Sequence, residues 1–203
     1  MPSSVTEIGT EAFWGCEDMT SISIGDNVRK IGNNAFYNCK SLKSVVLPDS
    51  VTSIGTGAFS GCESLREIVL PQGLTGIRES TFSGCVGLEK LYIPDKVKKI
   101  ENAAFWWCSN LETINCPADM EFTIGIDETA LMDTAWYQAD GYRILGTTLV
   151  RYNGDQEVLN DIPASIRRID TAAFYGQEKI KKMVLPEGVQ VIAGMAFEGC
   201  TGL

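Results

Sequence analysis

The sequence predicts a solenoid, a stack of short coils that each add one strand to a parallel sheet. The evidence is a single 23-residue period that three residue types share, which is typical of stacked repeats. The seven prolines are Pro2, Pro48, Pro71, Pro94, Pro117, Pro163 and Pro186. Six of seven cysteines keep the period: Cys16, Cys39, Cys62, Cys85, Cys108 and Cys200. Seven of eight phenylalanines keep it as well: Phe13, Phe36, Phe59, Phe82, Phe105, Phe174 and Phe197.

One unit reads Pro-x-x-Val-x-x-Ile-Gly-x-x-Ala-Phe-x-x-Cys-x-x-Leu-x-x-Ile-x-Leu, and its best copy runs from Pro48 to Leu70. The final Leu-x-x-Ile-x-Leu alternates apolar and polar residues and predicts a short strand, which the next proline ends because it lacks a ladder donor. In the middle of the unit, Val, Ile, Ala and Phe recur at three- or four-residue steps, which predicts a short helical turn. The phenylalanines are expected to form the spine of the core, since each coil buries its apolar residues against its neighbours.

The regularly spaced cysteines could form disulfides or bind a metal ion. Stacked side chains point in parallel directions that disfavour a disulfide, and no close C-x-x-C pair marks a zinc site. We therefore predict buried, reduced thiols, with disulfides and metal binding as weaker alternatives. Gln177 takes the cysteine position in one coil, so the stack tolerates the loss of the thiol. Cys116 is out of phase, and we expect it to be the exposed or reactive thiol.

Composition excludes several functions. The chain has 203 residues, a net charge of −9 and no histidine. The acidic balance argues against nucleic acid as a partner, and the absence of imidazole excludes Ser-His-Asp and Cys-His sites. No apolar run is long enough to predict a transmembrane segment. Asn153 to Glu157 offers oxygens at alternate positions without a complete calcium loop, so a solvated turn is the preferred interpretation there. We predict no enzyme activity, no cofactor and no metal.

The repeat fades between residues 118 and 160, where turn signals flank aromatic and β-branched runs. We interpret residues 1–203 as one solenoid, with regular repeats over 1–117, an irregular hairpin-like segment over 118–160 and regular repeats over 161–203. The irregular segment either keeps the stack continuous or forms a protruding or pocket-forming element that engages a partner. In the second case its contacts would be Trp136, Tyr137, Tyr142 and Tyr152.

Two exposed columns are further candidates for binding. In the strand, Val46, Val69 and Tyr92 lie in a row flanked by Glu67 and Lys90, which indicates either β-propensity or a partner-binding strip. A second column follows each phenylalanine and consists of Trp14, Tyr37, Ser60, Ser83, Trp106, Tyr175 and Glu198. It is expected to pack over the coil edge or to contact protein or glycan.

The unit written above resembles the BspA-like leucine-rich repeats of bacterial surface proteins. The resemblance implies a right-handed α/β-type superhelix with a parallel sheet on the concave face and short helical turns or irregular coil on the convex face. It implies an extracellular or cell-surface protein that binds a protein noncovalently, such as a host matrix protein (fibronectin or fibrinogen) or a protein of another cell surface. The alternatives are a structural spacer that displays other domains, or a glycan-binding module. Both ends lie within the repeat phase without caps, so we interpret the chain as a truncated piece of a longer protein. We expect either end-to-end association or a flexible C-terminal unit around Glu198 to Leu203.

Overall fold

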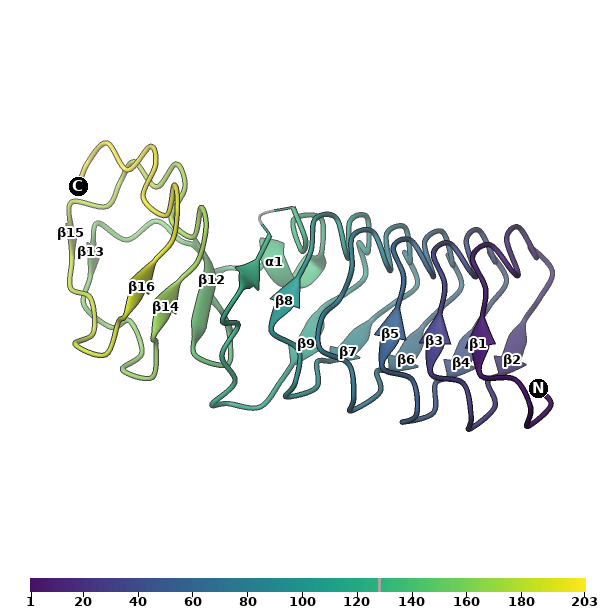
Figure 1. Cartoon of the computed structure of the whole chain (residues 1–203). Helices are drawn as coiled ribbons and strands as arrows, with labels where there is room; N and C mark the ends of the chain where they lie inside the picture. Colours follow the sequence, from purple (N-terminus) through teal and green to yellow (C-terminus); the bar gives the residue numbers. More distant parts are fainter. Residues whose placement is uncertain (128) are drawn as a thin grey trace.

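The computed structural model describes residues 1–127 and 129–203. The chain winds into a solenoid of about eight coils, each about 23 residues long. The N-terminal and C-terminal coils lie at opposite ends of the stack (Figure 1). The predicted solenoid with parallel sheets is therefore confirmed.

The predicted strands at the ends of the N-terminal units form one parallel sheet, called the broad sheet here. Its strand order is β2-β4-β6-β7-β9. The bounds are β2 (Ser21–Ser23), β4 (Ser44–Val46), β6 (Glu67–Val69), β7 (Lys90–Tyr92) and β9 (Thr113–Asn115). Neighbouring strands pair in register, as Val45↔Ile68 and Ile68↔Leu91 show. These central residues are buried, so the two residues beside each of them point outward, because side chains alternate along a strand.

A second column of strands lies in the middle of the coils, where the sequence predicts a helical turn (Figure 1). One group has the order β1-β3-β5 and the next pairs β8 with β10. The bounds are β1 (Glu7–Ile8), β3 (Lys30–Ile31), β5 (Ser53–Ile54), β8 (Lys99–Ile100) and β10 (Gly125–Ile126). The repeated isoleucine therefore belongs to a strand, and the turn around Ala-Phe begins only after it, over residues 56–61 in the coil of Phe59.

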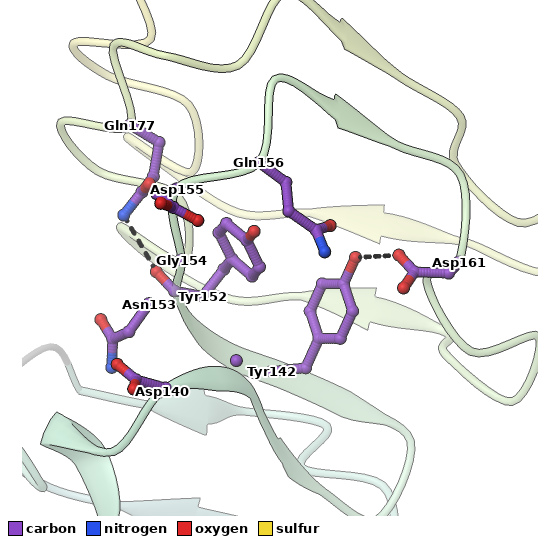
Figure 2. A pocket seen from close by; sticks show the side chains of 10 residues that line it. Asp140, Tyr142, Tyr152, Asn153, Gly154, Asp155, Gln156, Asp161 and Gln177 are labelled. Carbon is purple, nitrogen blue, oxygen red and sulfur yellow. Dashed lines mark hydrogen bonds between the residues drawn. The ribbon is translucent and has the colours of Figure 1, made fainter.

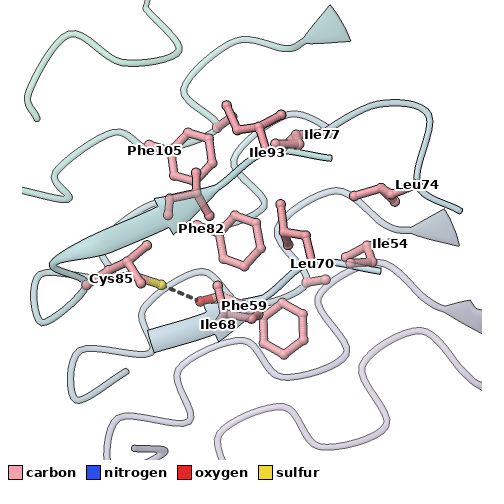
Figure 3. Packing of buried hydrophobic residues seen from close by; sticks show 14 of the residues in the cluster. Ile54, Phe59, Ile68, Leu70, Leu74, Ile77, Phe82, Cys85, Ile93 and Phe105 are labelled. Carbon is pink, nitrogen blue, oxygen red and sulfur yellow. Dashed lines mark hydrogen bonds between the residues drawn. The ribbon is translucent and has the colours of Figure 1, made fainter. Parts of the chain in front are cut away.

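The phenylalanine spine is confirmed as the centre of the core (Figure 3). Rings in successive coils stack with centroids 5.1–5.6 Å apart, and Phe59 and its neighbours Phe36 and Phe82 are fully buried. Each ladder cysteine after Cys16 donates its S–H to the phenylalanine carbonyl one coil earlier; Cys85 Sγ lies 3.2 Å from the Phe59 oxygen. The cysteine column is therefore a column of hydrogen-bond donors that also packs as a small apolar group.

Gln177 shows how the stack keeps this bond without a cysteine. In the preceding coil, Tyr152 occupies the phenylalanine position, with its ring 5.6 Å from that of Phe174. The Gln177 side-chain amide donates to the Tyr152 carbonyl oxygen at 3.1 Å, as Cys200 Sγ does to the Phe174 carbonyl. The replacement preserves the contact, which explains why the repeat accepts it.

The irregular segment contains the short helix α1 (Ala135–Gln138) and an antiparallel hairpin of β11 (Gly141–Leu145) and β12 (Thr148–Asn153). The hairpin turns at Gly146, whose φ is +55°. Leu149 packs into the C-terminal core and its neighbour Val150 into the N-terminal core. β12 therefore contributes a side chain to each core and separates the two, and we call it the partition.

The C-terminal coils continue both strand columns beyond this partition. The strands are β13 (Val158–Leu159), β14 (Arg168–Ile169), β15 (Lys182–Met183) and β16 (Val191–Ile192). β12 pairs with β14, β14 with β16, and β13 with β15, all in parallel. Within the described ranges, no helix has the length and hydrophobicity needed to cross a membrane.

A buried charge pair joins the two parts of the stack. The Asp170 carboxylate accepts from Arg168 Nε at 2.9 Å and from the backbone N–H of Ile126 at 3.1 Å. The second bond satisfies a donor of β10 that no strand pairs. Burial raises the pKa of the Asp170 carboxyl, while the Arg168 guanidinium opposes that rise.

Candidate binding surfaces

The outer face of the broad sheet carries three large apolar side chains in a row. Val46, Val69 and Tyr92 are 72%, 65% and 50% exposed. The strand pairing sets them side by side, with Val46 opposite Val69 and Val69 opposite Tyr92. We call these three residues, with Glu67 and Lys90, the sheet strip. Clustered apolar exposure of this kind is typical of interaction surfaces.

Charged residues lie beside this apolar row. Glu67 on β6 and Lys90 on β7 lie opposite each other in the strand register, and both are exposed. Neither forms an ion pair with another residue of the described chain. A shallow groove runs along the same strands, with Thr113 and Asn115 at its far side. The sheet strip therefore combines unpaired charges of both signs with an apolar centre.

The aromatic residues predicted as contacts in the irregular segment do not form one exposed cluster. Trp136 is only 8% exposed and packs in the N-terminal core, so its predicted contact role is corrected to a packing role. Tyr152 is also buried, in the C-terminal core. Tyr137 and Tyr142 are half-buried. Trp136 lies on α1 and Tyr152 on β12, so the two buried rings pack into the two different cores that meet at this segment.

A polar pocket lies beside the hairpin (Figure 2). The Tyr142 hydroxyl donates to Asp161 Oδ1 at 2.6 Å, and the Tyr142 and Tyr152 rings lie 5.0 Å apart. Burial, together with the Asp161 carboxylate, raises the pKa of the Tyr142 hydroxyl, so this group stays protonated at neutral pH. Asp140 and Asp155 complete an acidic rim. Within the described residues, no group of three or more acidic or cysteine side chains is arranged to hold a metal ion.

The repeat is matched by the family model for the BspA type leucine-rich repeat region. Six copies match, over residues 1–112 and 158–203. The chain belongs to this family. The unmatched residues, 113–157, include the hairpin. A comparison with curated proteins finds no match.

Solved structures show the same fold. A leucine-rich repeat protein of T. pallidum is 26% identical, with 100% of this chain and 76% of that chain covered and a TM-score of 0.58. A leucine-rich cell surface protein of Faecalibacterium prausnitzii A2-165 is 24% identical, with 100% and 73% covered and a TM-score of 0.63. The pneumococcal vaccine antigen PcpA is 21% identical, with 98% and 57% covered and a TM-score of 0.52. The chain is thus a leucine-rich repeat protein from a family of bacterial surface proteins.

The BspA-type cysteine column is chemically inert where it is buried. Cys39, Cys62, Cys85 and Cys108 are free thiols and fully buried. Burial raises the pKa of Cys39 to about 11 and that of Cys108 to about 12. Cys116 is only half-buried, but the exposed thiol is Cys16 in the first coil, so the prediction that Cys116 is the most exposed is wrong.

The turns that follow the phenylalanines line up from coil to coil, and we call this line of turns the turn ridge. One of its residues breaks the repeat pattern. Two residues after the phenylalanine, each regular coil has a left-handed residue. It is glycine in five coils (Gly15, Gly61, Gly84, Gly176 and Gly199) and asparagine in one (Asn38), both of which tolerate positive φ. In the coil of Phe105 it is Trp107, with φ +59° and 59% exposure. A bulky side chain in this conformation costs about 1–2 kcal/mol, and Trp107 is not placed in the core, where burial would offset that cost.

Proposed function

We propose that this chain is a noncovalent protein-binding module of the adhesion type, displayed on a bacterial surface or secreted. The observation that carries the proposal is the sheet strip, where three large apolar side chains are exposed in register. Tyr92 is the expected anchor, since tyrosine is enriched among the residues that dominate binding energy. The F. prausnitzii relative is described as a cell surface protein, which supports the location.

The partner we propose is a protein of the host matrix or of another cell surface. The apolar row supplies area to bury, and Glu67 and Lys90 supply unpaired charges at its border that set orientation and specificity. Strand backbone groups within the broad sheet are already paired with neighbouring coils. Recognition therefore takes place through side chains. End-to-end association of the terminal coils and the three-part division at residues 117 and 160 stay predictions.

The test is a double substitution in the sheet strip, Val69→Ser with Tyr92→Ser. Both side chains lie outside the core, so circular dichroism and melting temperature should stay unchanged. Capture of immobilised fibronectin or fibrinogen, measured by surface plasmon resonance, should weaken roughly tenfold or more, because a buried aromatic anchor is worth about 2 kcal/mol or more.

A matched control makes the same change elsewhere. Tyr175→Ser with Val191→Ser removes a tyrosine and a valine of comparable exposure, 50% and 41%, outside the sheet strip. The control should bind as the unchanged protein does. Equal capture by the strip variant and the control would remove the sheet strip as the binding surface. If the unchanged protein binds none of a panel of matrix proteins, the result would favour the spacer function.

A further inference from the structure

We propose that a trough on the turn ridge, between Tyr37 and Trp107, binds a neutral oligosaccharide. The trough crosses the coils of Phe59 and Phe82 and has a volume of about 720 Å³, within the range of ligand sites. It lies among the turns that follow the phenylalanines, and none of the sheet-strip residues lines it. The site is thus a second binding surface, independent of the proposed protein-binding strip.

The trough exists because the aromatic column is interrupted. The residues after the phenylalanines are aromatic in the outer coils, where Tyr37 and Trp106 stand, but serine in the two coils between them. Ser60 and Ser83 leave space, and the glycine that follows each of them has no side chain. The small residues therefore form the floor of the trough, and Tyr37 and Trp107 form the walls at its two ends.

The floor offers hydroxyls rather than backbone groups. The backbone N–H of Gly61 donates to the Ser83 carbonyl, and that of Gly84 donates to the Trp106 carbonyl, both at 2.7 Å. An extended peptide therefore finds no free edge to pair with. The hydroxyls of Ser60 and Ser83, in contrast, form no hydrogen bond to any group of the described residues. Free hydroxyls matched to many ligand hydroxyls favour a sugar over a peptide.

The end walls are rigid aromatic faces. Trp107 stacks on Trp106 with centroids 4.6 Å apart, and Tyr37 stacks on Trp14 at 4.3 Å. Ring faces carry negative partial charge and attract the positively polarised C–H groups of a pyranose face. Trp107 is held in its left-handed conformation although glycine serves most other coils, and it stays 59% exposed although it stacks on Trp106. Backbone strain at an exposed aromatic residue is found more often at binding and active sites than elsewhere.

The negative charge of the trough favours an uncharged ligand. The charged residues that line the trough are Glu63 and Asp133, with no lysine or arginine. Like-charge repulsion excludes uronates, sialylated glycans and other polyanions. The ligand is therefore an uncharged chain of several sugars, long enough to reach from one aromatic wall toward the other across three coil steps of 5.1–5.6 Å.

The test titrates the full chain with hexamers of β-1,4-linked glucose, mannose and N-acetylglucosamine, followed by calorimetry and tryptophan fluorescence. A galacturonate hexamer is the anionic comparator. We expect at least one neutral hexamer to bind and to quench emission, and the galacturonate hexamer to remain unbound. Absence of binding by all three neutral hexamers up to about 10 mM would overturn the proposal, and so would equal binding of the galacturonate hexamer.

Three variants locate the site. Trp107→Gly installs the residue that five other coils carry, so the fold is preserved, and affinity should fall roughly tenfold or more. Ser83→Tyr fills the floor with a side chain that the same column accepts at Tyr37 and Tyr175, and it should abolish binding. Tyr175→Ser removes an exposed aromatic residue of this column outside the trough and should bind normally. Unchanged affinity in both trough variants would place any sugar binding elsewhere and refute the assignment.

Discussion

Truncation of one central ring, Phe59→Ala, tests whether the phenylalanine spine holds the stack together. The ring is fully buried and lies 5.1 Å from the Phe36 ring and 5.6 Å from the Phe82 ring. Its removal leaves a cavity that neighbouring coils cannot fill, because the backbone ladders fix the spacing of the coils. Phenylalanine-to-alanine changes of this kind cost about 3–5 kcal/mol.

The expected shift follows from the size of the chain. For proteins of 150–250 residues, each kcal/mol lowers the melting temperature by about 2–4 °C. Phe59→Ala should therefore melt roughly 6–20 °C lower, and urea unfolding followed by circular dichroism should show a lower midpoint. Since a solenoid is stabilised by neighbour contacts, loss at a central coil also decouples the coils on either side.

The matched control is Phe13→Ala in the first coil. Phe13 is half-buried and stacks on one ring, that of Phe36 at 5.1 Å. Its truncation should cost roughly 1–2 kcal/mol, because less area is removed from contact and solvent already reaches the site. Equal losses for the two variants, or a loss below about 1 kcal/mol for Phe59→Ala, would refute the spine as the main source of stability.

Two further predictions concern buried ionisable groups. Iodoacetamide at pH 8 should label the exposed Cys16 first and the half-buried Cys116 more slowly. Cys85 should stay unlabelled until urea unfolds the chain, because the reactive form is the thiolate and burial disfavours it. Mass spectrometry of the peptides gives the order of labelling, and early labelling of Cys85 would contradict the packing. Burial raises the pKa of Asp170 in the folded state, so its stabilising contribution is complete below the unfolded value of about 3.9 and is lost as pH rises through the folded value. Asp170→Asn should therefore gain stability relative to the unchanged protein between pH 3 and pH 7 in urea unfolding, and a constant difference would show that Arg168 cancels the effect of burial.

The repeat period predicted the spine, the cysteine column and the strands of the broad sheet, because one side chain per coil recurs at each of these positions. It did not predict the second strand column. A strand of two residues, such as Ser53–Ile54, is too short to show alternation, and Val51 and Ile54 stand three apart as on a helix. The neighbouring coil, rather than the local sequence, makes this segment a strand.

The candidate sites were predictable to the extent that they lie in repeated columns. Val46, Val69 and Tyr92 were found from their strand position, and the structure places them in register. Trp136 was misjudged because its burial depends on the core that the partition β12 closes, which no local pattern records. Asp170 was missed for the same reason, since its partners Arg168 and Ile126 meet only where the two parts of the stack join.

Residues that depart from the repeat consensus can be structural or functional, and their effect on stability distinguishes the two cases. Gln177 departs from the cysteine consensus but restores the same hydrogen bond one coil back, so nothing is lost and no function is implied. Trp107 departs from glycine at a left-handed position, adds backbone strain and leaves the residue 59% exposed beside Trp106. A strained, exposed residue of this kind is expected where a ligand supplies a compensating contact. The Trp107→Gly variant therefore carries opposite expectations for its two readouts: the melting temperature rises or stays the same, while sugar affinity falls.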